Sequence, residues 1–158
     1  MFSIIGPYFD EEDRVLDLFA GTGGLGIEAL SRGAGRAVFV DLNPRSIEVV
    51  RRNLEAARLA DRAEVYRIDA GKAVRMLERR GEPFSLLFLD PPYAMRDCDE
   101  RLGELQRRGL AAEGAIAVVE HAADFRYPDE IGGFRLKRYA RYGDTALSIY
   151  RYGGESHL

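Results

Sequence analysis

The sequence predicts an α/β fold, with a mostly parallel sheet of about seven strands, helices on both faces and an antiparallel hairpin at the end. Two observations predict this class. Apolar runs typical of strands alternate with stretches of helical period, which is the pattern of βαβ units. In the last third, short alternating segments flank a glycine-first turn. The 158 residues, 46% hydrophobic and 31% charged, fit one globular domain spanning 1–158.

Five apolar runs have the length and composition of strands. The segment 84–89 is almost continuously apolar, so we expect it in mid-sheet with both faces covered. The expected strands are 15–19, 37–40, 65–68, 84–89 and 115–120.

Four helices are expected between these strands. Asn43 and Pro44 form an N-cap followed by proline at the first helical position, and Ile47, Val50 and Leu54 then keep helical spacing. The segments 24–32, 70–80 and 97–108 are the other helices, and each ends at a glycine: Gly33, Gly81 and Gly109.

The end of the chain predicts a hairpin. Segments 134–137 and 145–150 both alternate in hydrophobicity, and Gly143 and Asp144 between them suit a type II′ turn. The sheet should therefore close with antiparallel strands.

Composition excludes several functional classes. A net charge of −3 argues against a protein that coats nucleic acid electrostatically, although a local basic face stays possible. No apolar run approaches the roughly 20 residues of a membrane span, and no secretory signal is apparent, so we expect a cytoplasmic protein. One cysteine and two histidines give no basis for a disulfide or a metal site. A monomer is the simplest expectation for the oligomeric state.

Acidic residues end the expected parallel strands. Asp17 lies at the end of the first strand, while Asp41, Asp69 and Asp90 close the next three. Ligands of open α/β sheets bind beyond these strand ends. A row of carboxylates repels phosphate and suits a ligand that is cationic at its reactive end and rich in hydroxyl and amino donors.

A glycine loop follows the first strand. Residues 21–26 fit the pattern G-x-G-x-x-G, and Asp41 stands about 20 residues past Gly21, the spacing at which an acid accepts ribose hydroxyls. A tight turn with helix-capping acids is the purely structural alternative. NAD is the rival ligand, but its pyrophosphate is disfavoured by the nearby Asp17. The loop thus favours S-adenosylmethionine, a sulfonium without phosphate.

The turn Asp90-Pro91-Pro92-Tyr93 follows the expected central strand. Two prolines make the turn stiff. The Asp90 carboxylate and the Pro91 carbonyl can accept the two N–H bonds of an exocyclic base amine, which directs its lone pair at an electrophile, while Tyr93 can stack on the base. These four residues are the predicted catalytic set, and a proline turn with an exposed tyrosine is the structural alternative.

At this point the sequence resembles a known family. Residues 15–23 (VLDLFAGTG), 90–93 (DPPY) and 142–150 (YGDTALSIY) together are similar to the bacterial 16S ribosomal RNA guanine methyltransferases that modify the 2-amino group. The first two motifs are shared with DNA adenine methyltransferases, and the third is more specific. The resemblance implies a class I, Rossmann-like methyltransferase sheet, ribose contacts from Asp41, adenine packing at Leu42 and adenine amino contacts at Asp69. The expected cofactor-binding residues are Asp17, Phe19, Ala20, Gly21, Thr22, Gly23, Asp41, Leu42, Asp69 and Ala70.

The predicted function is methyl transfer from S-adenosylmethionine, with S-adenosylhomocysteine as product, to the 2-amino group of a guanine in 16S rRNA of the small ribosomal subunit. The base must be exposed or flipped to reach the turn. DNA adenine methylation is an alternative, although no target-recognition insertion is visible. An NAD-dependent oxidoreductase and a non-catalytic RNA-docking module are alternatives from other classes. Family members also carry a basic N-terminal segment ahead of the stretch that residues 2–6 resemble, which we expect this chain to lack.

Weaker signals have competing interpretations. A basic and aromatic stretch is either RNA-facing or a solvated strand face with ion pairs; it comprises Arg135, Lys137, Arg138, Tyr139, Arg141 and Tyr142. Cys98 has no visible activating cation and is expected to be a bystander. His121 is expected to be a hydrogen-bonded loop residue.

Overall fold

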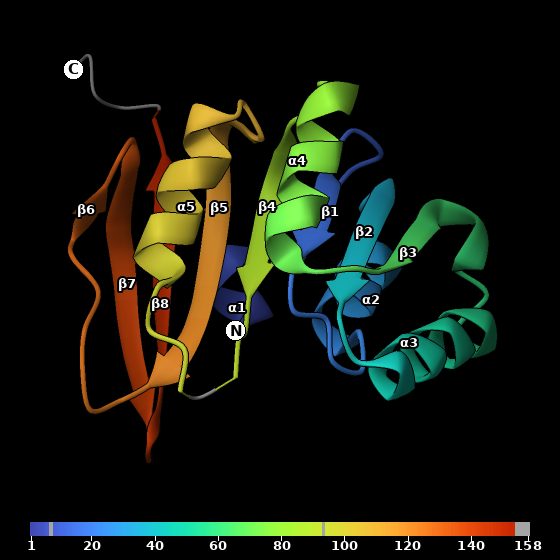
Figure 1. Cartoon of the computed structure of the whole chain (residues 1–158), viewed down its shortest axis with the longest axis horizontal. Helices are drawn as coiled ribbons and strands as arrows, with labels where there is room; N and C mark the ends of the chain where they lie inside the picture. The colour runs from blue at the N-terminus through green and yellow to red at the C-terminus, as the bar shows by residue number, and fades with distance from the viewer. Residues whose placement is uncertain (7, 93, 154–158) are drawn as a thin grey trace.

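A computed structural model describes residues 1–6, 8–92 and 94–153. Its centre is an eight-stranded sheet in the order β3-β2-β1-β4-β5-β8-β7-β6 (Figure 1). The first five strands in this order, β3, β2, β1, β4 and β5, pair in parallel. The last three, β8, β7 and β6, add antiparallel strands at one edge. The strands are β1 (Arg14–Asp17), β2 (Arg36–Asp41), β3 (Ala63–Arg67), β4 (Phe84–Leu89), β5 (Ala111–Ala122), β6 (Glu130–Ile131), β7 (Phe134–Tyr142) and β8 (Thr145–Tyr152).

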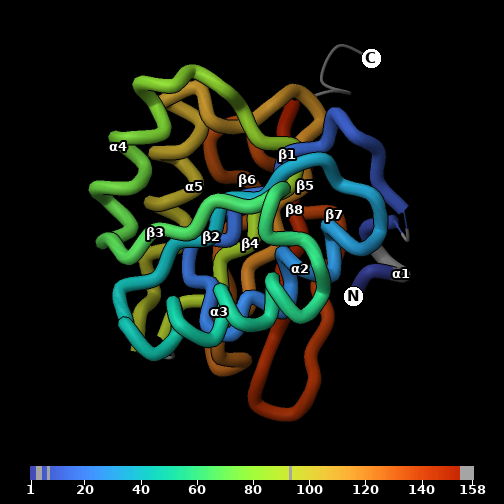
Figure 2. The backbone as a smooth tube through the Cα atoms, turned by 90° about the vertical axis from the view of Figure 1, so that its right-hand side faces the viewer, coloured from blue at the N-terminus to red at the C-terminus, as the bar shows by residue number. Residues whose placement is uncertain are grey.

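Helices cover both faces of the sheet, as expected. One face packs on α4 and α5 around Leu77, Leu102 and Leu105, and the other packs on α1, α2 and α3 around Phe2, Leu30 and Val50. Figure 2 shows α4 and α5 on the side opposite α1 and α2. The helices are α1 (Phe2–Ile5), α2 (Gly24–Ser31), α3 (Pro44–Ala56), α4 (Ala70–Arg80) and α5 (Cys98–Arg107), with a 3₁₀ turn η1 (Ala60–Arg62) after α3. Every helix in the described part of the chain falls short of the length and hydrophobicity that a membrane crossing requires.

Helix ends follow the sequence signals closely. The Asn43 side chain accepts a hydrogen bond from the backbone N–H of Arg45, and Pro44 occupies the first helical position of α3. Gly81 ends α4 in the left-handed region at φ 67°, where a Cβ would be strained. The predicted positions of α3 and α4 are confirmed.

The antiparallel hairpin is also confirmed. Tyr142 pairs with Thr145 across a loop of two residues, and Gly143 has φ 63° while Asp144 does not have a positive φ. This pattern matches a type II′ turn. Strand β4 lies between β1 and β5, which places the apolar segment in mid-sheet as predicted.

Several boundaries differ from the expectation, and short elements are added. Strand β1 ends at Asp17 and not at residue 19, because Leu18 and Ala20 donate their N–H groups to different neighbours, Phe88 and Val40, as the chain turns out of the sheet. Strand β5 runs to Ala122 because β8 continues to pair with it there. The short β6 adds an eighth strand, and the four-residue α1 was not predicted from the sequence.

Candidate active site

The carboxyl ends of the parallel strands meet at one edge of the sheet and carry the predicted acids. Asp17 and Asp41 are the last residues of β1 and β2, and Asp90 follows β4 directly. Asp69 lies two residues past β3 and caps α4, with its side chain accepting from the Lys72 N–H at 3.2 Å. Two cavities open at this edge.

The first cavity, of about 450 Å³, lies over β2, β3 and β4. Apolar walls dominate, and Asp41 and Asp69 stand among them as acceptors. Such a slot suits a flat apolar ring system that carries hydroxyl and amino donors. The lining residues are Leu18, Phe19, Gly21, Asp41, Leu42, Asn43, Ile68, Asp69, Ala70, Asp90, Pro91, Pro92, Met95 and Arg101.

Asp41 connects the glycine loop to the start of α3. One carboxylate oxygen accepts from the Gly21 N–H at 2.9 Å, and the other accepts from the Asn43 N–H at 2.9 Å. A carboxylate offers about four acceptor positions, so capacity for ligand hydroxyls is left at the cavity wall. Asp41 therefore fixes the shape of the cavity wall and can also accept hydrogen bonds from a ligand in the cavity.

Each glycine of the loop is required for a different structural reason. Gly21 has φ 59°, with nothing within 4 Å of where a Cβ would be, so it leaves the cavity mouth open. A Cβ at Gly23, where φ is 80°, would press on Val50 at 3.1 Å. At Gly26 it would meet the Phe39 ring at 2.4 Å, so α2 can pack on β2 only with glycine there. Gly23 lines neither cavity.

Asp17 is enclosed rather than displayed at the rim. Its side chain is 1% exposed and accepts a hydrogen bond from the Gly26 N–H at 3.2 Å. Burial, opposed by that hydrogen bond and reinforced by Asp90 and Asp41, raises the pKa of Asp17 to about 8. We expected four carboxylates to place negative charge at this edge. Asp17 differs from that expectation, because with this pKa it is mostly neutral near pH 7.

The second cavity, of about 480 Å³, lies between the glycine loop, α2 and the end of β5. It is lined by Asp17, Phe19, Ala20, Gly21, Thr22, Gly24, Leu25, Asp90 and Glu120. Phe19, Gly21 and Asp90 line both cavities. The two spaces therefore adjoin at these three residues, and Asp90 is the one among them that carries a carboxylate.

Asp90 and the prolines form the wall at this meeting point. Asp90 is exposed at the cavity wall, and partial loss of its hydration together with the charge of Glu120 raises its pKa to about 6. Pro91 is buried and Pro92 exposed, and the Pro92 carbonyl accepts from the Met95 N–H at 2.9 Å, which closes the turn. Tyr93 lies outside the described residues, so its predicted role stays a prediction.

The structure adds residues that the sequence analysis missed. Glu120 ends the expected fifth strand, so the same rule that pointed to the aspartates could have found it. Asn43, Ile68 and Met95 line the first cavity without a distinctive motif. Arg101 also lines it and pairs with Glu104 at 2.6 Å, so the cavity wall is not purely acidic.

The basic and aromatic stretch on β7 does not form one surface. Arg135 pairs with Glu130 at 2.9 Å, Arg141 donates to the Gly143 carbonyl, and Lys137 and Arg138 line a separate groove beside Ile5. Tyr142 is 59% exposed next to the hairpin tip, which projects beyond the body of the protein in Figure 2.

The two remaining weak signals are structural. His121 is buried in β5, not in a loop, and its ring contacts the Ser148 hydroxyl and the Ala122 carbonyl at 2.8 Å each. Cys98 is buried, and burial raises its pKa to about 11. Within residues 1–6, 8–92 and 94–153, no group of three His, Cys, Asp or Glu side chains could hold a metal ion.

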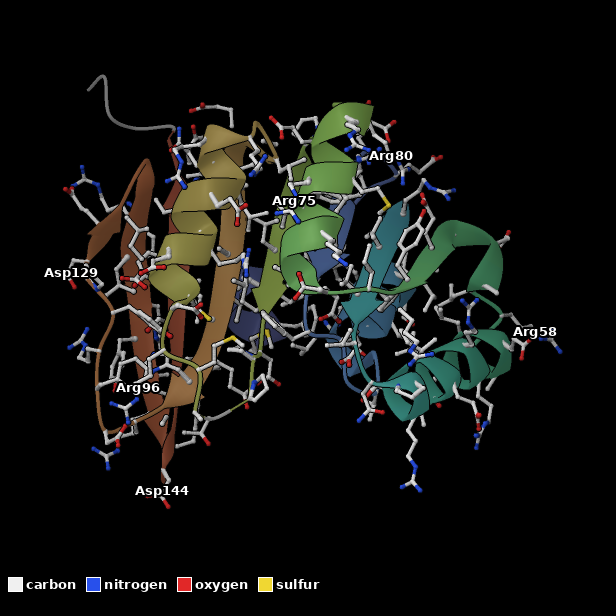
Figure 3. The ribbon with its side chains drawn as sticks, in the orientation of Figure 1. Arg58, Arg75, Arg80, Arg96, Asp129 and Asp144 are labelled. Atoms are coloured by element: carbon white, nitrogen blue, oxygen red, sulfur yellow. The ribbon has the colours of Figure 1, made fainter. Side chains whose placement is uncertain are left out.

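The surface of the protein carries many arginines and acids on its helices. In Figure 3, Arg75 projects from α4 and Arg58 lies at the end of α3, while Arg96 extends near the loop after β4. Arg96 pairs with Asp124 at 2.9 Å and lies over the Phe125 ring at 4.5 Å. Part of the positive charge near the site is thus held in ion pairs.

The parallel strand order, the glycine loop with its acid at the end of β2, and the double cavity are those of the Rossmann-like, S-adenosylmethionine-dependent methyltransferases, and the chain is a member of this class. Within the class it belongs to the family described as "Conserved hypothetical protein 95", whose model matches residues 1–151.

Two relatives support membership of this family by sequence similarity. "Putative rRNA methyltransferase YlbH" of Bacillus subtilis is 40% identical over 154 residues, which cover 98% of this chain and 83% of the relative. "Ribosomal RNA small subunit methyltransferase D" of Escherichia coli is 29% identical over 151 residues, covering 96% of this chain and 74% of the relative. The resemblance on which the sequence analysis relied is confirmed.

Solved structures agree with the fold. A conserved hypothetical protein of Streptococcus pyogenes superimposes with a TM-score of 0.91 at 35% identity, covering 99% of this chain and 95% of the other. An RNA methyltransferase of Salinibacter ruber, solved with S-adenosyl-L-homocysteine, has a TM-score of 0.66 at 19% identity, covering 92% and 84% of the two chains. The latter likeness supports the fold alone.

Proposed function

We propose that the protein transfers a methyl group from S-adenosylmethionine to the 2-amino group of a guanine in 16S rRNA of the small ribosomal subunit. The observation that carries the proposal is the meeting of the two cavities at Asp90, with a rigid proline turn beside it. The E. coli relative named as a small-subunit rRNA methyltransferase supports the choice of RNA. With such a substrate, the protein would act in the cytoplasm, where ribosomes are assembled.

The residues of the first cavity fit the cofactor. Asp41 can accept ribose hydroxyls, Leu42 and Ile68 can pack on the adenine ring, and Asp69 can accept from its amino group. Gly21 lines both cavities, so the methionine part would lie along the glycine loop, and the part of the second cavity beside Asp90 and Glu120 would be left for the target base. When bound, the cofactor supplies an electrophilic methyl group on a sulfonium.

The chain's own groups act on the amine. Asp90, ionised above its raised pKa of about 6, can accept one amine N–H, and the Pro91 carbonyl can accept the other. Two fixed acceptors orient the nitrogen lone pair and stabilise the positive charge that develops on nitrogen as the N–C bond forms and the methyl–sulfur bond breaks, with neutral S-adenosylhomocysteine as the leaving group. The proton then leaves the alkylated amine, and Asp90 lies where it can receive it.

The first alternative is a DNA adenine substrate, which the same Asp-Pro-Pro turn could accommodate. The described residues 94–153 after the turn form α5 and the remaining strands, without an inserted recognition domain. An NAD-dependent reaction is disfavoured because Asp41, Asp69 and Asp90 line the first cavity.

The testing experiment is transfer from labelled S-adenosylmethionine to small ribosomal subunits lacking the modification, to naked 16S rRNA and to DNA, followed by nucleoside analysis. The proposal predicts 2-methylguanosine from a ribosomal substrate. Label recovered as N6-methyladenine from DNA would contradict it. A binding competition between NAD and S-adenosylhomocysteine would distinguish the methyltransferase from the oxidoreductase alternative.

A further inference from the structure

Glu120 lies beside Asp90 because of the register between two parallel strands. Leu89 of β4 is the partner of Val119 of β5, so the next residues along, Asp90 and Glu120, are level with each other. Neighbouring strands lie about 4.8 Å apart. Leu86 and Phe88 of β4 pack in the core beneath α2, and every second residue shares that face, so Asp90 points the same way.

The two side chains face the same cavity from adjacent strands. Both line the space of about 480 Å³, and Glu120 is half-buried there. The charge of Glu120 contributes to the raised pKa of Asp90, as expected for carboxylates at the ends of adjacent strands. Thr22 and Leu25 also line this cavity, together with Asp17 and residues of the glycine loop.

Within residues 1–6, 8–92 and 94–153, no donor reaches this pair of carboxylates. Over the residues that the structure describes, neither Asp90 nor Glu120 accepts a hydrogen bond, whereas Asp17, Asp41 and Asp69 each accept at least one from a backbone N–H. Adjacent carboxylates that repel each other and lack donors favour a ligand edge with several N–H groups. This requirement is met by few base edges.

Guanine presents such an edge. Its Watson–Crick side carries N1–H next to the 2-amino group, giving three N–H bonds in a row, while adenine has an acceptor at N1. If Asp90 and the Pro91 carbonyl hold the amine, one carboxylate is left for N1–H. An enzyme that takes a base out of its stack reads this edge by hydrogen bonds.

We propose that Glu120 is the residue that selects guanine, by accepting the N1–H bond of the base whose amine Asp90 holds. The inference rests on the proposed function and extends it from the reaction to the choice of base. A site built to accept a hydrogen bond rejects an analogue without the donor, because the half-buried Glu120 carboxylate would then be left unpaired and would face another acceptor.

The test uses a base that keeps the reactive amine and loses the N1 proton. The guanine identified by the transfer assay is replaced in the RNA by 2-aminopurine, and kcat/KM for transfer is measured on both RNAs. Wild-type protein should prefer guanine strongly. Glu120→Gln, whose amide can donate to N1, should lower that preference about 10- to 100-fold. Glu55→Gln, an exposed glutamate on α3, is the matched control and should keep it.

Each other outcome has a distinct meaning. Equal transfer to both RNAs by the wild-type protein, or an unchanged guanine preference in Glu120→Gln, would overturn the proposal while leaving the proposed function in place. Weaker S-adenosylhomocysteine binding in Glu120→Gln with unchanged base preference would assign Glu120 to the cofactor instead. Failure of the wild-type protein to methylate guanine in any RNA would overturn the proposed function itself.

Discussion

The backbone N–H of Gly21 donates a hydrogen bond to the Asp41 carboxylate over 2.9 Å, so a residue at the end of β2 fixes the loop that follows β1. The second oxygen of the same carboxylate holds the Asn43 N–H. Asp41 thus joins two segments of the cavity wall, which gives it an architectural role besides the ribose contact that we propose.

Asp41→Ala should weaken S-adenosylhomocysteine binding about 10- to 100-fold, since hydrogen bonds to a charged group contribute about 1.5–3 kcal/mol. Isothermal titration calorimetry measures the effect. Asp61→Ala, at an exposed acid of η1, serves as the control and should bind normally. Normal binding by Asp41→Ala would exclude Asp41 from the cofactor site.

Gly26→Ala should destabilise the protein by about 1–3 kcal/mol, the usual cost of overpacking a core. The new methyl group would meet the fully buried Phe39 ring at 2.4 Å. Urea unfolding checks this through a lower midpoint. Gly24→Ala is the matched control on the same helix, because its nearest contact is at 3.5 Å and its φ is not positive. Equal midpoints for the two variants would refute the tight packing of α2 on β2.

Asp17 should make stability fall as pH rises. Its pKa is about 8 in the folded protein against an ordinary value of 3.8, so between these values the folded state holds a proton that the unfolded state has released. Stability then declines with increasing pH over this window. Asp17→Asn keeps an acceptor for the Gly26 N–H and removes the titration. Its stability relative to wild type should rise from pH 5 to pH 8 in urea titrations, and a constant difference would contradict the burial of this acid.

The activity should depend on the ionisation of Asp90. Because an ionised carboxylate is the acceptor, kcat/KM should fall as pH drops through about 6, the raised pKa of this group. Removing the neighbouring charge by Glu120→Gln should shift the midpoint to lower pH. A pH profile with the same midpoint in both proteins would show that the two carboxylates are not coupled.

Much of the fold could be predicted because its signals are local. The Asn43-Pro44 cap, the stop at Gly81 and the apolar run of β4 each depend on neighbours in sequence. Strand ends were less certain, since β1 stops where Leu18 and Ala20 bond to different strands, which is a tertiary event.

The candidate site divides in the same way. The glycine loop and Asp41 were recognisable from spacing alone, and the structure brings them into contact. The neutral state of Asp17 depends on how deeply the fold buries it, and Arg101 reaches the first cavity only through the packing of α5. The position of Glu120 beside Asp90 depends on the register between β4 and β5, which a single sequence does not specify.

The most direct test of the central claim is the single-turnover rate of methyl transfer to small ribosomal subunits by Asp90→Ala, with S-adenosylhomocysteine affinity measured on the same sample. The account predicts a rate lower by about 100-fold or more, as for loss of a group that stabilises the transition state, with nearly unchanged cofactor affinity. A rate close to that of the wild-type protein would contradict the claim that the cofactor and the target amine meet at Asp90.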